Sequence, residues 1–144
     1  MSCLLRDRPA STLEMLTAFG DEALLRAALA FEAMLARAQA EAGLIPALAA
    51  ETIAAACAEL PDVGTLAEAA AHAGTLAIPL VTLIRERIAD PEIAKLVHKG
   101  ATSQDLADTA VGAAGAEADC GVTEFEAAEA VPNPFELRAR TLNV

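Results

Sequence analysis

One segment constrains the fold more than any other, because residues 21–42 carry apolar side chains at intervals of three and four. The stripe consists of Leu24, Ala28, Phe31, Leu35, Ala38 and Ala42. Such a spacing is typical of an amphipathic helix with one face turned toward a core. Gly43 follows the stripe and Pro46 lies just beyond it, as is common after the end of a helix. We therefore predict a long helix over residues 21–42.

The rest of the chain up to residue 97 also has helical patterns and no strand pattern. Further helices are expected over residues 11–18, 46–60, 65–74, 75–88 and 91–97. Hydrophobic residues make up 55% of the sequence and aromatic ones only 3%, so that Ala and Leu dominate, which favours helices. Short connections favour antiparallel neighbours. The predicted fold class is all-α, an antiparallel helical array.

Local signals set the predicted helix ends. Ser11 with Glu14, and Thr65 with Glu68, have the spacing of capping boxes. Gly74 is expected to stop the helix that Thr65 begins. Asp90, followed by a proline, is expected to cap the helix that leads into residue 98.

The helix after Gly74 has a predicted inner and a predicted outer side. Its buried side chains are expected to be Ile78, Val81, Ile84 and Ile88. Its solvated face is expected to carry Arg85, Glu86 and Arg87.

Residues 97–110, VHKGATSQDLADTA, have the features of an anion site. Gly100 permits a turn, and Thr102 and Ser103 supply hydroxyl groups. The residues that follow open a helix, whose unpaired N–H groups attract a negative group such as a carboxylate. The alternative is purely structural, because Thr102 and Asp105 also have the spacing of a capping box.

The same residues carry a family resemblance. The pattern HxGATSQDxxDTA, which begins at His98, is similar to the first signature segment of the fumarase/aspartase superfamily, and most similar to its 3-carboxy-cis,cis-muconate cycloisomerase branch. FEAMLARAQAEAGLIP at residues 31–46 and AGTLAIPLV at residues 73–81 resemble that branch in the same order. The resemblance spans residues 20–110 and implies the helical N-terminal domain of the superfamily.

The resemblance also implies site residues. Thr102 and Ser103 correspond to residues that bind a substrate carboxylate, and His98 corresponds to a residue at the edge of that site. Thr75 is a weaker substrate-binding candidate, with a plain helix cap as the alternative. Lys99 departs from the family, which is expected to have an aromatic or large apolar residue there.

The family's reaction is a cofactor-free addition or elimination beside a carboxylate, which in the cycloisomerase branch closes a muconate to a lactone. Its proton-transfer serine lies in an SSxMPxKxN loop and a histidine lies in a middle segment; neither motif occurs in these 144 residues. We therefore assign no catalytic residue and expect this chain alone to be inactive. The implied partners are a small polycarboxylate substrate and further subunits, since the family's active site combines three subunits of a tetramer.

Other classes of function find little support. The net charge of −11 leaves no basic stripe for nucleic acid. Cys3, Cys57 and Cys120 have neither disulfide nor metal spacing, and we expect reduced thiols in a cytoplasmic protein with no metal and no cofactor. No run of about 20 apolar residues predicts a membrane span. His72 is expected at the surface.

The sequence changes character after Ala110. Gly112, Gly115 and Gly121 are expected to interrupt any helix, and Pro132 and Pro134 to forbid a late one. We predict a lyase-like domain over residues 1–110 and a poorly ordered, flexible tail over residues 111–144, as in a truncated family member.

Two rival interpretations remain open. The chain could be an adenylosuccinate lyase-like fragment, which keeps the fold but changes the substrate. It could instead be a non-catalytic helical module that associates with itself or with a fuller relative through exposed apolar faces.

Overall fold

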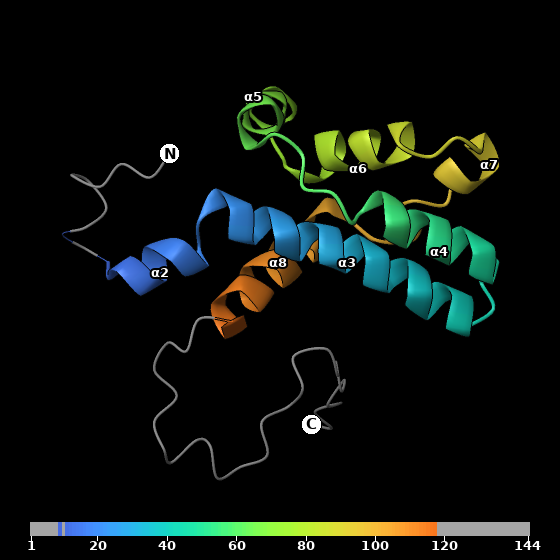
Figure 1. Ribbon diagram of the computed structural model, residues 1–144, viewed down its shortest axis with the longest axis horizontal. Coiled ribbons are helices and arrows are strands. Elements are labelled where there is room, and N and C mark those ends of the chain that lie inside the picture. Colours follow the sequence, from blue (N-terminus) through green and yellow to red (C-terminus); the bar gives the residue numbers. More distant parts are fainter. Residues whose placement is uncertain (1–8, 10, 118–144) are drawn as a thin grey trace, which may run out of the picture.

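The structure is a computed structural model that describes residue 9 and residues 11–117 (Figure 1). Every regular element in this part of the chain is a helix: α2 (Leu13–Ala18), α3 (Asp21–Glu41), α4 (Ala47–Ala56), α5 (Val63–Ala73), α6 (Ala77–Glu86), α7 (Pro91–Ala94) and α8 (Ser103–Glu117). The all-α prediction is confirmed. None of these described helices combines the length and the apolar character needed to cross a bilayer.

Helix α3 is the centre of the arrangement. It packs most extensively against α4, which returns beside it, and against α8, which crosses it. Helices α5 and α6 pack on each other above this pair, and α7 lies at the far end next to α4 and α6 (Figure 1). The chain then returns to start α8 near the middle of α3, so the 97–103 loop lies against the central helix.

The turn from α3 to α4 follows the prediction closely. Gly43 has a φ of 72°, and its amide donates to the Ala40 carbonyl at 3.0 Å. The Leu44 amide donates to the Gln39 carbonyl at 2.8 Å. These two bonds form a Schellman motif, which closes α3 with a left-handed residue.

The buried face of α3 is rotated by about one position from the predicted stripe. Its buried residues are Leu25, Ala28, Leu29, Glu32 and Ala36. Leu24 and Phe31 are half-buried, whereas Ala38 and Ala42 are exposed. The difference arises because α3 is packed between α4 and α8, so the positions that face both neighbours are the deepest. Neighbour positions are a tertiary property that the spacing alone does not contain.

Helix α6 shows one wrong assignment of a buried residue. Ile78 is 55% exposed, while Leu80 is completely buried. Val81, Ile84 and Ile88 are buried as predicted.

The predicted solvated face of α6 is confirmed for Arg85 and Glu86, which are exposed, whereas Arg87 is half-buried. The guanidinium groups of the two arginines turn back to main-chain carbonyls, Arg85 to Val97 at 3.0 Å, and Arg87 to Ala56 and Glu59 at 2.9 and 2.7 Å. A guanidinium can serve a solvated face and a carbonyl at once, since it presents five donors.

Two predicted caps are displaced, the first by one residue toward the C-terminus and the second by three residues toward the N-terminus. Thr12, rather than Ser11, accepts the Met15 amide at 3.2 Å and caps α2. Asp62 accepts the Thr65 amide at 2.7 Å and caps α5. The Asp90 cap of α7 and the left-handed Gly74 at the end of α5 are confirmed. Helix α4 ends at Ala56, short of the expected Leu60.

Helix α8 corrects the expectation for the residues just after Ala110, because it continues through Gly112 and Gly115 to Glu117. A Cβ at Gly115 would stand 3.1 Å from the Phe19 ring, so this glycine permits close packing. Packing of α8 against α3 outweighs the weak helix propensity of glycine. The flexible-tail prediction for residues 118–144, which include Gly121, Pro132 and Pro134, lies outside the described residues. The domain boundary at residue 110 stays a prediction.

Candidate functional site

The loop between α7 and α8 contains two residues in the left-handed region. Gly100 has a φ of 77°, as expected for the turn. His98 has a φ of 62° and is the one non-glycine residue with positive φ in the described part of the chain. Histidine tolerates this region better than most residues, yet the conformation costs about 1–2 kcal/mol. Tertiary contacts must therefore hold His98 in place.

The side chain of His98 makes such a contact with α3. Its Nδ1 lies 2.5 Å from Oε1 of Glu32. The Glu32 side chain is 0% exposed and that of His98 is 14% exposed. The Phe31 ring lies beside the imidazole, with 6.5 Å between the ring centroids. The pair joins the loop to the buried face of the central helix.

Burial raises the pKa of Glu32 above its ordinary value, since the ionised carboxylate loses its hydration. The hydrogen bond to His98 and the charges of His98 and Arg85 oppose this rise. Oε2 of Glu32 is buried without a hydrogen-bond partner. The charge state of this carboxyl group therefore depends on its histidine.

Two more side chains hold the main chain of the same loop. Arg85 of α6 donates to the Val97 carbonyl at 3.0 Å, and Gln39 of α3 donates to the Lys99 carbonyl at 2.5 Å. Val97, His98 and Lys99 are thus each fixed by a different side chain of another helix. Lys99 itself is exposed, so the departure from the family at this position leaves the loop packed.

Thr102 and Asp105 form the capping box that the structural alternative predicted. Asp105 Oδ2 accepts the Thr102 amide at 2.7 Å and the Thr102 hydroxyl at 2.8 Å, and the Asp105 amide donates back to Thr102 Oγ1 at 3.2 Å. These bonds lower the pKa of the Asp105 carboxyl group. In this conformation the Thr102 hydroxyl is committed to the cap.

Ser103, the first residue of α8, is half-buried, and its side chain makes no hydrogen bond with the described residues. Its hydroxyl is free to meet a ligand, and His98 lies within the same short loop. Thr75 lies outside this loop, just before α6, and its hydroxyl accepts the Ala77 amide at 3.3 Å. Of the four predicted substrate-binding residues, Ser103, Thr102 and His98 thus share one loop.

Glu32 is the residue that sequence reasoning missed. A signal was present, since Glu32 lies four residues after Ala28 and four before Ala36, on what proved to be the inner face. A glutamate at such a position is rarely buried unless it is paired. Its partner is 66 residues away in sequence, so the pairing itself could not be seen.

Other groups offer little chemistry. Cys57 is a buried free thiol, and burial raises its pKa to about 11, which makes it a poor nucleophile. His72 is exposed, as predicted. In residues 9 and 11–117 no group of three or more His, Cys, Asp or Glu side chains could hold a metal ion.

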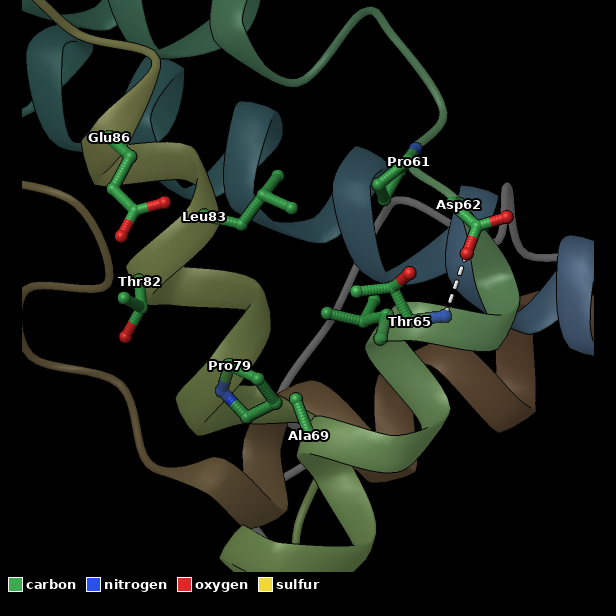
Figure 2. A pocket seen from close by; sticks show the side chains of 9 residues that line it. Pro61, Asp62, Thr65, Ala69, Pro79, Thr82, Leu83 and Glu86 are labelled. Carbon is green, nitrogen blue, oxygen red and sulfur yellow. Dashed lines mark hydrogen bonds between the residues drawn. The ribbon is translucent and has the colours of Figure 1, made fainter.

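A groove of about 370 Å³ lies between α5 and α6 (Figure 2). Its lining is mostly apolar, with Asp62 and Glu86 at its edges. Figure 2 shows the Asp62 carboxylate turned to the Thr65 amide that it caps. Because its two charged residues are both acidic, this groove would repel a carboxylate, and the 97–103 loop is the better candidate site.

Comparison with known proteins agrees with the fold. No protein-family model matches the chain. A solved structure of the 3-carboxy-cis,cis-muconate lactonizing enzyme from Pseudomonas putida superposes with a TM-score of 0.70 at 44% identity, covering 79% of this chain and 27% of that one. The beta-carboxy-cis,cis-muconate cycloisomerase from Acinetobacter calcoaceticus superposes with a TM-score of 0.68 at 37% identity, covering 74% of this chain and 26% of that one. The helical array is that of the fumarase/aspartase superfamily.

Sequence comparison narrows this class. The chain is 54% identical over 94 residues to 3-carboxy-cis,cis-muconate cycloisomerase of Pseudomonas putida, which covers 63% of this chain and 22% of the relative. It is 50% identical over 103 residues to the same enzyme of Bradyrhizobium diazoefficiens, which covers 69% of this chain and 23% of the relative. It is 39% identical over 100 residues to N-acetyl-S-(2-succino)cysteine lyase of Enterococcus italicus (69% and 22%). The matched region is thus related to the 3-carboxy-cis,cis-muconate cycloisomerases, as the motifs predict. The chain spans less than a quarter of the length of these relatives.

Proposed function

We propose that this chain supplies one carboxylate-binding wall of a cycloisomerase-type active site, with 3-carboxy-cis,cis-muconate as the ligand. The observation that carries the proposal is the fixed 97–103 loop, which leads into α8 at Ser103, a residue whose hydroxyl has no partner among the described residues. The relatives' names supply the substrate class.

The geometry supports the following binding roles in this proposal. Ser103 donates its hydroxyl to a ligand carboxylate at the N-terminus of α8, where the helix dipole favours a negative group. His98 lies at the edge of the same site. Thr102 joins only if a ligand displaces its hydroxyl from Asp105, which would leave the cap with its two amide bonds.

We propose further that these 144 residues do not turn over the substrate alone. They contain no SSxMPxKxN motif and no assigned proton-transfer residue. Additional subunits of the same kind or a fuller relative would complete the site, and a cytoplasmic location goes with this proposal.

A purified sample tests the function directly. Binding of 3-carboxy-cis,cis-muconate is measured by NMR shifts, and lactonisation by absorbance, on the wild type, on Ser103→Ala and on the control Thr109→Ala, whose exposed hydroxyl lies on the same helix. We expect binding without turnover, weaker binding in Ser103→Ala and no change in the control. No binding in the wild type, or turnover by it, would contradict the respective part of the proposal.

The second candidate is a lyase that removes a succinyl group, which the N-acetyl-S-(2-succino)cysteine lyase relative favours. Competition between the muconate and a succinylated thiol or nucleotide distinguishes the two, because the true substrate class displaces the other.

Association is the third candidate, and the surface favours it. Several large apolar side chains are exposed: Leu13, Phe19, Met34, Leu44, Leu48, Ile78 and Val111. Light scattering on the same sample measures association, and a strict monomer would count against an oligomer built by this chain.

A further inference from the structure

The contact between Glu32 and His98 has features that the proposed function does not explain. A carboxyl group with 0% exposure is costly unless its oxygens are hydrogen-bonded, and Oε2 of Glu32 has no partner. His98 also occupies a left-handed conformation. Two unfavourable features in one contact indicate a functional constraint rather than a contribution to stability.

The contact leaves one imidazole nitrogen available. Nδ1 is occupied by Glu32 Oε1, and Nε2 makes no hydrogen bond to the described part of the chain. Nε2 is also reached by solvent. Among the described residues, Oε2 of Glu32 is the only buried side-chain nitrogen or oxygen that has no hydrogen-bond partner, so the unpartnered Nε2 is not buried. A ligand beside the loop would therefore meet Nε2.

The number of protons on the pair decides what Nε2 can do. With one proton shared between Nδ1 and the carboxylate, Nε2 carries a lone pair and repels a carboxylate. With two protons, the pair is an imidazolium beside a carboxylate or a neutral ring beside a carboxylic acid. Nε2 carries a hydrogen in both forms, so only the two-proton pair donates to a ligand carboxylate.

We propose that Glu32 is a positioning residue that presents Nε2 of His98 to a ligand carboxylate, and that the pair takes up one proton from solvent when the ligand binds. The inference rests on the proposed function, because it requires a carboxylate beside the 97–103 loop. No covalent bond forms or breaks in this step.

The charged groups around the pair do not change their charge near neutral pH. Arg85 of α6 acts on Glu32 and stays protonated. Asp105 of α8 faces His98, and its lowered pKa keeps it ionised. Cys57, at the end of α4, stays a neutral thiol, because burial and the charge of Glu32 raise its pKa to about 11. Burial raises the pKa of Glu32, which brings a protonated carboxyl group closer to neutral pH.

Calorimetry tests the proton uptake. Tricarballylate, a stable saturated tricarboxylate, is titrated into the wild type, Glu32→Gln and the control Glu41→Gln, an exposed glutamate on the same helix, in two buffers of different ionisation enthalpy from about pH 5 to about pH 9. We expect the wild type and the control to take up about one proton and to lose affinity about tenfold per pH unit in the upper part of the range. Glu32→Gln should take up none and show a flat profile, since its amide can donate to Nδ1 and leave the hydrogen on Nε2.

Nitrogen-15 NMR of the two histidines gives a second readout. Ligand binding at high pH should convert Nε2 of His98 from the bare to the protonated form, while His72 on α5 serves as an unaffected internal reference. His98→Asn, which tolerates the left-handed region, covers the case in which Glu32→Gln does not fold, and should also lose the proton uptake.

The outcomes separate the two proposals. Equal proton uptake and equal pH slopes in the wild type and in Glu32→Gln or His98→Asn overturn the inference and leave the carboxylate site intact. No binding of either tricarballylate or the muconate by the wild type overturns the proposed function, and this inference with it.

Discussion

The α3–α4 hairpin and the 97–103 loop both pack on the central helix, but different forces hold them. The hairpin buries Ala and Leu-type side chains, such as Ala28, Ala50 and Ile53, whose attraction has no direction. The loop is held by directional bonds to Glu32 and Gln39. The first region gives the domain its stability, whereas the second fixes the position of a few polar atoms. Substitutions should separate these two effects.

The largest effect is expected inside the hairpin. Ile53→Ala removes a side chain that is only 1% exposed, and should lower the free energy of unfolding by about 2–5 kcal/mol because it leaves a cavity. Leu48→Ala, on the same helix but 73% exposed, should change it by less than about 0.5 kcal/mol. Urea unfolding measures both, and equal losses would show that α4 is not packed as described.

Replacing a glycine by alanine should have opposite effects on stability in the loop and in helix α8. Gly100→Ala places a side chain at a φ of 77° and should destabilise by about 1–2 kcal/mol. Gly112→Ala lies within α8 with open space around it, and should stabilise by up to about 1 kcal/mol. Thermal unfolding measures the stability change of both variants. An increase in stability in Gly100→Ala would mean that the loop adopts another conformation.

Replacing the buried carboxyl group should separate stability from binding. Glu32→Met keeps the volume and removes the cost of burying a carboxyl group, but it also leaves Nδ1 of His98 without its partner. Because these two effects oppose each other, the free energy of unfolding should change by less than about 1 kcal/mol. Binding of the tricarboxylate should nevertheless weaken, because nothing holds His98. The matched measurements are urea unfolding and calorimetry, and a large loss of stability with unchanged affinity would reverse the assigned roles.

The smallest effects lie in the pH dependence, with opposite signs for two carboxyl groups. Hydrogen bonds lower the pKa of Asp105, so its stabilisation is present above the unfolded pKa and is lost as pH falls through the folded one. Burial raises the pKa of Glu32, so stability is highest below its unfolded pKa and falls as pH rises through the folded one. Asp105→Asn should therefore be less stable than the wild type at neutral pH, and this difference in the free energy of unfolding should disappear in acid. The free energy of unfolding of Glu32→Gln should rise relative to that of the wild type as the pH rises. Urea midpoints across pH measure both, and parallel curves would contradict the assignment.

Much of the fold was predictable because it depends on local chemistry. The long helix, its end at Gly43, the Asp90 cap and the left-handed Gly74 all follow from residues within one or two turns of each other. The capping box of Thr102 and Asp105 was visible for the same reason. Their ligand roles, with those of His98, Ser103 and Thr75, stay predictions.

The wrong predictions concern properties that depend on packing between helices. The exposure of Ile78 and the burial of Leu80 depend on how α6 packs against α5, α7 and α8, and the persistence of α8 beyond Ala110 depends on its packing against α3. Helical spacing defines a stripe but does not say which edge of the stripe faces the deeper neighbour.

The sequence by itself determined the helical class, the order of the helices, the turn at Gly100 and the motif that relates this chain to the cycloisomerases. Only the tertiary structure brought Glu32 to His98 across 66 residues and turned Arg85 and Gln39 onto the same loop. The physical reason is range: propensities and caps act within a turn or two of helix, whereas a buried polar pair exists only after packing has removed water from both partners.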